Sequence, residues 1–343
     1  MAGVSGSEGE LLDAVRRGDE DAFGRLVEPY TSELHAHCYR MLASPFDADD
    51  ALQETLLRAW RAAPRFRGYD RLRAWLYKIA TNVCLDALER RRRRGLPIEH
   101  GQPATPDADP GTPLSDSVWV QPYPDEVLGL EDGYTSPEAR YEQREAVELA
   151  FIAALQHLAP SQRAVLLLRD VLGYSAKEAA GTLDTTIASV NSALQRARRT
   201  VDERIPARSQ QATLRSLGDE RVRSIVEGYI DAWERGDVEA LVAMLAEDAT
   251  FSMPPYRTWW RGRDVIAAFA AESVHRYISL RANGQAANAA YRLDERRDAY
   301  VAEALEVLSL EGTSVREMTA FMMPDVFPLF GLPSQLPRNT TKT

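Results

Sequence analysis

The chain has 343 residues, a net charge of −10 and 45% hydrophobic residues. This length favours two or three domains over one core, and no apolar run reaches the roughly 18 residues that a membrane span needs. The two cysteines, Cys38 and Cys84, predict neither a disulfide framework nor a metal site. The first ten residues lack the basic segment of a signal peptide. We expect a cytoplasmic protein without a metal, a cofactor or membrane contact.

Residues 9–94 are predicted to form a helical domain, because apolar residues recur at three- and four-residue spacing with breaks at Gly and Pro. The segment ends in five arginines, Arg90 to Arg94, although the chain as a whole is acidic. Neighbouring like charges destabilise a helix, so the cluster indicates a polyanionic partner such as nucleic acid. A solvated helix end, where the helix dipole favours arginine, is the alternative.

At 100° per residue, Trp75, Lys78 and Asn82 share one face of the helix that begins near Leu72. An aromatic ring, a cation and an amide can stack a base, hold a phosphate and read a base edge. Trp75 could instead belong to the core, but the nearby arginines favour contact with nucleic acid. The phosphate-contact candidates are Arg65, Arg67, Arg71, Arg73, Arg90 and Arg91.

Residues 95–137 are rich in Pro, Gly, Asp and Ser and contain no Lys or Arg, which predicts an acidic linker. An aromatic cluster that includes Trp119 and Tyr123 interrupts it, and we expect this cluster to dock on another surface because apolar rings are costly to leave in water.

Residues 138–206 predict a second helical domain that ends in a helix-turn-helix. Ser175 and Glu178 form a capping-box pattern, and a turn at Asp184 leads to a last helix that begins at Ile187. The expected buried stripe of that helix is Ile187, Val190, Leu194, Ala197 and Val201. The opposite side presents Ala188, Ser189, Ser192, Gln195, Arg196 and Arg199.

Two pairs of motifs in the same order resemble bacterial RNA polymerase sigma factors of the extracytoplasmic-function group. Residues 49–60 and 66–82 resemble region 2, and residues 158–169 and 173–180 resemble region 4. The resemblance implies a protein that directs promoter-specific transcription initiation. Trp75, Lys78, Asn82 and the arginines named above would melt and read the −10 element, and the last helix would read the −35 element. Asp184 departs from the glycine often found at that turn.

The resemblance also implies core RNA polymerase as the partner, bound through its β′ clamp helices and β flap. Asp50, Gln53, Glu54 and Leu57 would contact the polymerase, and the acidic linker would occupy its basic channels. A charged, solvated face is the alternative for these residues.

Residues 218–333 predict an α+β domain, so the chain is multidomain, with two all-α parts followed by a mixed one. Residues 229–241 and 246–251 resemble SnoaL-like members of the cone-shaped NTF2-like superfamily. Met253 stands where the isomerases of that superfamily carry a catalytic carboxylate, so we expect no enzyme activity. The candidate pocket residues are Tyr229, Met253, Trp259 and Trp260, with an unknown small molecule as ligand.

The domain order resembles a sigma subgroup with a fused C-terminal regulatory domain, which implies activity tuned in cis, and the chain is similar to the SigG-type branch. Two alternatives remain open. A helix-turn-helix regulator that works without polymerase would explain residues 138–206 but not residues 49–82. An isomerase-like or cyclase-like enzyme with a DNA-binding appendage would need an open polar pocket.

Overall fold

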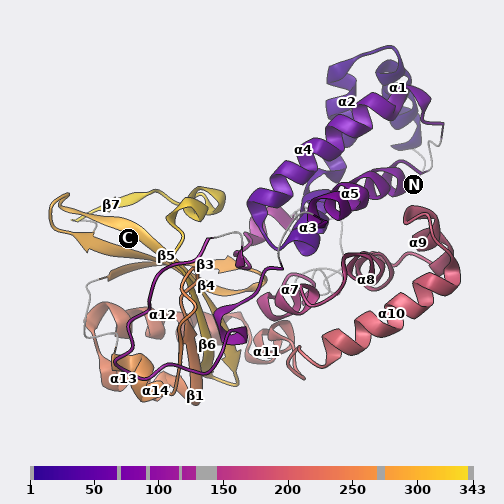
Figure 1. The fold of residues 1–343 in the computed structure, drawn as a ribbon. Helices are drawn as coiled ribbons and strands as arrows, with labels where there is room; N and C mark the ends of the chain where they lie inside the picture. The colour runs from indigo at the N-terminus through magenta and orange to yellow at the C-terminus, as the bar shows by residue number, and fades with distance from the viewer. Residues whose placement is uncertain are drawn as a thin grey trace. The chain divides into compact units, whose positions relative to one another are not determined.

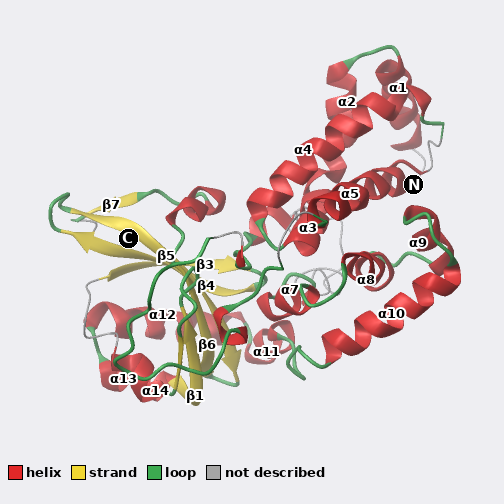
Figure 2. Cartoon of the chain, viewed as in Figure 1, coloured by secondary structure: helices red, strands yellow, loops and turns green. Residues whose placement is uncertain are grey.

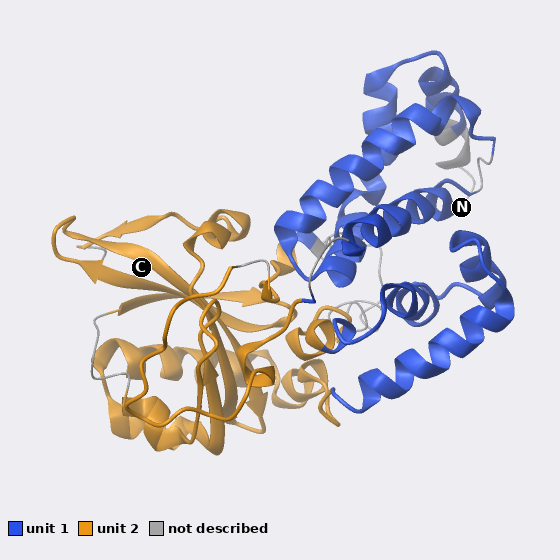
Figure 3. Ribbon diagram, viewed as in Figure 1, with its two compact units in different colours: residues 1–93, 127–134, 154–204 blue, residues 94–126, 135–153, 205–343 orange. Residues whose placement is uncertain are grey.

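A computed structural model describes residues 4–67, 71–89, 93–115, 118–128, 145–268 and 275–338. The chain divides into two compact units (Figures 1 and 3). Unit 1 comprises residues 1–93, 127–134 and 154–204, and unit 2 comprises residues 94–126, 135–153 and 205–343. Arg90 and Arg91 lie outside the described residues.

Unit 1 begins with helices whose ends follow local capping signals. Asp19 accepts a hydrogen bond from the Ala22 amide, and Ser44 accepts one from the Asp47 amide with Pro45 in the first turn. The helices are α1 Val4–Arg16, α2 Glu20–Val27, α3 Thr31–Leu42, α4 Pro45–Ala62 and α5 Leu72–Leu88, with short 3-10 turns η1 Glu28–Tyr30 and η2 Ala63–Arg65.

Helix α5 contacts α3 and α4, and its Leu72, Leu76 and Val83 are buried. It ends at Leu88, so the described arginines of the run, Arg93 and Arg94, lie beyond the helix rather than on it. The expectation that the run closes the helix is wrong for these two residues.

The remaining helices of unit 1 contain the predicted helix-turn-helix. They are α7 Leu149–Leu155, α8 Pro160–Leu166, the short π-helix η7 Leu167–Val171, α9 Ala176–Thr182 and α10 Ile187–Asp202. The first five residues of α7 belong to unit 2. The Ser175–Glu178 capping box is confirmed. Val190, Leu194, Ala197 and Val201 are buried. Ile187 is 48% exposed, because the adjoining turn is itself exposed and provides no apolar partner.

Unit 2 has an α+β fold, as predicted (Figure 2). Its sheet has the order β2-β1-β6-β5-β4-β3, and β7 pairs with β5. The β1–β6 pair is parallel and the other pairs are antiparallel. The strands are β1 Leu245–Ser252, β2 Trp259–Arg261, β3 His275–Ala282, β4 Gln285–Asp294, β5 Ala299–Glu311, β6 Ser314–Phe321 and β7 Gln335–Pro337, and the helices are α11 Gln210–Leu217, α12 Asp219–Arg235, α13 Val238–Met244 and α14 Arg263–Ala268.

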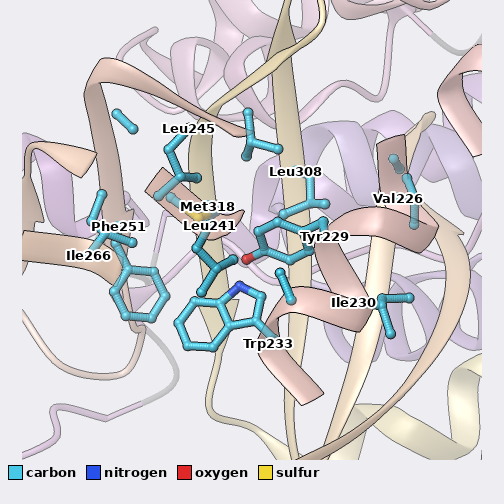
Figure 4. Packing of buried hydrophobic residues seen from close by; sticks show 14 of the residues in the cluster. Val226, Tyr229, Ile230, Trp233, Leu241, Leu245, Phe251, Ile266, Leu308 and Met318 are labelled. Atoms are coloured by element: carbon cyan, nitrogen blue, oxygen red, sulfur yellow. The ribbon is translucent and has the colours of Figure 1, made fainter. Parts of the chain in front are cut away.

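One face of this sheet packs against the helices. Tyr229 and Trp233 of α12, with ring centroids 6.1 Å apart, lie among Leu241, Leu308 and Met318 (Figure 4). The opposite face receives the apolar C-terminal segment, a 3-10 helix η9 Pro324–Phe330. The fully buried Phe327 of that helix meets Tyr291 edge to face at 5.2 Å. Each side of the sheet therefore has its own apolar layer.

The described part of the predicted linker packs on the sheet domain within unit 2. The Ala104 amide donates to the Trp259 carbonyl at 2.8 Å, and the Leu114 amide donates to the Pro255 carbonyl at 2.9 Å. Trp119 and Tyr123 are fully buried, so the prediction that this cluster docks is confirmed. The buried Arg94 donates to the Trp119 carbonyl at 2.8 Å and thereby holds the docked segment.

Candidate functional site

The predicted −10 face of α5 is partly occupied within unit 1. Trp75, Lys78 and Asn82 are all half-buried and share one side of the helix. The Trp75 ring stacks on Phe66 with centroids 4.4 Å apart and planes 23° apart. Lys78 Nζ donates to the Gly181 carbonyl at 3.0 Å and to Asp184 Oδ1 at 2.7 Å. Two of the three side chains therefore contact the chain itself in this conformation.

The arginines predicted near this face differ in whether they already form an ion pair within the chain. Arg65, Arg67 and Arg71 are exposed, and Arg67 donates to the Pro64 carbonyl at 2.9 Å. Arg73 instead forms a bidentate pair with Glu33 and lies 4.8 Å from the Tyr77 ring centroid. Arg73 is therefore already committed to an intramolecular partner.

Helix α10 presents its predicted DNA side to solvent. Ala188, Ser189, Ser192, Gln195, Arg196 and Arg199 are all exposed. A groove of about 750 Å³ runs beside Gln195 and Arg199 and continues past Arg198, which pairs with Asp170 at 2.6 Å. The opposite side of the helix is buried, so one face remains available for the major groove of DNA.

The predicted polymerase-binding residues lie on one side of α4. Asp50 and Gln53 are exposed, Leu57 is 42% exposed, and Glu54 accepts from Arg58 at 2.7 Å. Asp50 and Glu54 line a groove of about 400 Å³ whose other acidic residues are Asp47, Asp86 and Glu89. Arg58 bridges that groove to Asp86 at 2.9 Å. The groove therefore carries an excess of negative charge beside one exposed leucine.

Unit 2 contains a cavity of about 160 Å³ between α12 and the sheet. Met253 lines it as predicted, and the buried Tyr229 hydroxyl lies 3.4 Å from Glu306 Oε2 of the lining. Trp259 and Trp260 do not line this cavity in the described part of the chain. They belong to the edge strand β2, where Trp260 Nε1 donates to the Thr105 carbonyl at 3.2 Å. The cavity lining is Trp233, Phe251, Met253, His275, Tyr277, Ala290, Glu303, Ala304, Glu306, Ala320 and Met322.

The cavity holds two carboxyl groups that the sequence reasoning missed. Met253 stands where related isomerases carry a catalytic carboxylate, but β5 supplies Glu303 and Glu306 to the same cavity. Burial raises the pKa of Glu306 to about 7. Burial also acts to raise the pKa of Glu303, but hydrogen bonds from His275 and Arg292 outweigh it and keep that pKa below its usual value. The strand pattern at residues 299–310 was the signal, because it places residues 304, 306 and 308 on one face.

A second feature that the sequence reasoning missed is a side-chain clasp at the β3–β4 turn. Asn283 Oδ1 accepts from the Tyr123 amide at 2.9 Å, and Asn283 Nδ2 donates to the Val147 carbonyl at 2.8 Å. The Gly284 amide donates to Asp125 Oδ1 at 2.7 Å, and Arg281 also contacts that carboxylate. Asp125 of the acidic linker thus has a cationic partner, Arg281, from outside the linker.

Among the residues that the structure describes, no group of His, Cys, Asp and Glu is arranged to hold a metal ion. A search of the same residues finds no helix with the length and apolar character of a membrane span.

Comparisons with known proteins match three parts of the chain. Residues 26–94 match Sigma-70 region 2, residues 142–201 match Sigma-70 region 4, and residues 226–313 match the SnoaL-like domain. The ECF RNA polymerase sigma factor SigG of Mycobacterium tuberculosis is 42% identical over 331 residues, which span 94% of this chain and 86% of that protein. The sigma factor SigM of the same species is 32% identical over 56% of the chain and 81% of its own length.

The crystal structure of the M. tuberculosis extracytoplasmic function sigma factor SigJ has a TM-score of 0.56 at 20% identity. It covers 90% of this chain and 99% of its own. At that identity it supports the fold: helical sigma domains followed by a mixed SnoaL-like domain. The protein is thus a sigma factor with a fused C-terminal α+β domain. The match to SigG shows that the chain belongs to the ECF RNA polymerase sigma factors, a regulatory family that acts in transcription initiation.

Proposed function

We propose that this sigma factor recognises a bipartite promoter through α5 and α10 and is tuned in cis by its SnoaL-like domain. The main support for promoter recognition is that all six predicted contact residues of α10 are exposed. The preceding helix α9 begins with the predicted capping box. Their small polar and basic side chains suit base edges and phosphates of the −35 element.

The −10 contact is assigned to Trp75, Lys78 and Asn82. Bases are read on their pairing edges only after unpairing, and stacking on an aromatic ring offsets part of that energy. Trp75 already stacks on Phe66, and this aromatic pair supports the proposal because a further planar ring could stack on it. In the proposed open complex, an unpaired base stacks on this aromatic pair and Lys78 moves from Asp184 to a phosphate.

Core polymerase is the proposed partner of the acidic groove on α4. Asp50, Gln53 and Glu54 would bind the β′ clamp helices, with Leu57 as the apolar anchor, and the region 4 helices would bind the β flap. The acidic groove offers electrostatic complementarity to a basic partner surface, and Leu57 beside it offers an apolar contact.

Support for cis tuning comes from the linker. Residues 94–126 pack on the sheet domain rather than forming a free tether, and the clasp at Asn283 holds both Tyr123 and Val147. A docked linker cannot at the same time extend into a polymerase channel, so release of the clasp would favour the active form.

Run-off transcription with core polymerase and genomic fragments tests recognition. Alanine at Trp75, Lys78 and Asn82 together should abolish permanganate-detected promoter opening while leaving polymerase binding intact. The matched control is alanine at Arg25 and Glu28, two exposed residues away from both faces. Normal promoter opening by the triple variant would refute the assignment.

The cis-tuning proposal is tested separately by the full-length Asn283→Gly variant in the same assay. We expect a change in transcript yield at constant sigma concentration. Equal yield from both proteins, with the linker shown to be released, would refute tuning while leaving promoter recognition untouched.

A further inference from the structure

The cavity of unit 2 combines a buried acid with an aromatic wall. Glu306 is 4% exposed, and among the described residues it forms no ion pair. The Tyr229 hydroxyl lies 3.4 Å from it. Asn288 lies opposite Glu306 on the neighbouring strand β4, and its side-chain amide is near enough to favour the charged form of the Glu306 carboxylate. That amide makes no hydrogen bond of ordinary geometry within the described chain. A buried carboxylate without a cationic partner is costly, so this position favours a ligand that brings a positive charge.

The other acid of the cavity is already neutralised. His275 Nε2 lies 2.6 Å from Glu303 Oε2, and Arg292 Nε lies 2.5 Å from Glu303 Oε1. Arg292 already balances the charge of Glu303. His275 also acts on Glu306 through space, but its ring is engaged with Glu303, so Glu306 is left without an ion pair among the described residues. No Lys or Arg lines the cavity among the residues described. An anionic ligand would meet two carboxyl groups and no free cation.

The walls also suit a cation. Trp233, Phe251 and Tyr277 line the cavity, and the faces of aromatic rings attract ammonium groups. Met253 and Met322 complete the lining with flexible, polarisable side chains that adapt to ligand shape. Figure 4 shows Trp233 and Phe251 among the buried hydrophobic side chains of this domain.

Volume limits the size of the ligand. The cavity measures about 160 Å³, and an engineered protein cavity of about 150 Å³ binds benzene. A single six-membered ring with a one-carbon arm therefore matches the size of the cavity.

We propose that this cavity binds a small organic monocation, a primary amine on a ring about the size of benzene, whose ammonium group pairs with Glu306. This assignment does not depend on the proposed promoter contacts or on cis tuning.

The test uses three ligands of nearly equal shape: benzylamine, benzyl alcohol and benzoate. Each is titrated into the unaltered full-length protein, and binding is followed by ligand-observed NMR and calorimetry. We expect benzylamine to bind at least tenfold more tightly than benzyl alcohol near pH 8, and benzoate not to bind. Tighter or equal binding of benzyl alcohol or benzoate, or no binding of any of the three, would overturn the proposal.

Proton linkage gives a second readout on the same unaltered chain. Ionised Glu306 is the binding form, and its pKa of about 7 means that benzylamine affinity should rise about tenfold from pH 6 to pH 8. The titratable groups that face Glu306 are Tyr229 from α12, His275 and Tyr277 from β3, and Glu303 on its own strand. Glu306→Gln should abolish both the preference for the amine and this pH dependence. The control Glu311→Gln changes an exposed acid on the same strand and should retain both. Unchanged benzylamine binding by a folded Glu306→Gln protein would exclude the pairing.

Discussion

Asn283→Gly is the sharpest test of how the linker is held. Asn283 is fully buried and joins two separate segments through its side chain, with the Tyr123 amide on one atom and the Val147 carbonyl on the other. Its φ is +55°, a left-handed conformation that glycine adopts without strain. The substitution therefore removes the two side-chain hydrogen bonds without disturbing the turn.

The expected cost follows from the two groups left without partners. Each buried amide or carbonyl that loses its hydrogen bond costs about 1–3 kcal/mol. Relief of the left-handed strain at a non-glycine residue returns roughly 1–2 kcal/mol. We therefore expect a net loss of up to about 5 kcal/mol of unfolding free energy, confined to the docked linker and the start of α7.

Hydrogen exchange measures this locally, because the Tyr123 amide is itself the donor to Asn283. Its protection should fall by at least fivefold, together with that of nearby amides of residues 118–128, while β5 amides keep theirs. Asp298→Gly is the matched control: Asp298 also has a positive φ, of 48°, but among the described residues its side chain bonds only the exposed Arg338. Unchanged protection at Tyr123 would show that the side-chain clasp does not hold the linker.

Three further predictions concern DNA binding and pH. Asp184→Asn removes the ion pair with Lys78, and asparagine tolerates the positive φ at this turn. Because both side chains are partly exposed, the affinity of the free protein for mixed-sequence single-stranded DNA should rise by no more than about fivefold. No rise relative to an Asp202→Asn control would argue that Asp184 does not restrain Lys78. Arg199→Ala should weaken promoter binding across all sequences and reduce the salt-dependence slope by about one, whereas Arg208→Ala should leave that slope unchanged. The pKa of Glu306 is raised from 4.5 to about 7, so the folded state retains a proton that the unfolded chain releases. This contribution to the unfolding free energy is complete below about pH 4.5 and is lost as the pH rises towards 7. In urea unfolding, Glu306→Gln should therefore reduce the decrease in unfolding free energy over this pH range by about 3 kcal/mol. An unchanged pH profile would contradict this.

Much of unit 1 could be predicted from local sequence signals. The capping box at Ser175, the periodicity of α10 and the separation of its buried and exposed sides depend on residues within four positions of one another. The prediction that Ile187 is buried was wrong. This residue lies where the helix meets an exposed turn, and periodicity does not show whether an apolar partner lies opposite a given helix position. Strand β4 was missed for a similar reason: its run of alanines has little strand propensity and is strand-forming only between β3 and β5.

By itself, the sequence determined the order of the parts, the sigma-factor resemblance and the faces of individual helices, since these follow from motifs and from the fixed geometry of a helix. Tertiary structure alone decided which distant groups meet. It brought Glu306 into a cavity with Trp233 from a different element, engaged Lys78 with Asp184, and placed Asn283 between two segments of the chain. Such contacts depend on strand register and on the packing of whole elements, which no local pattern encodes.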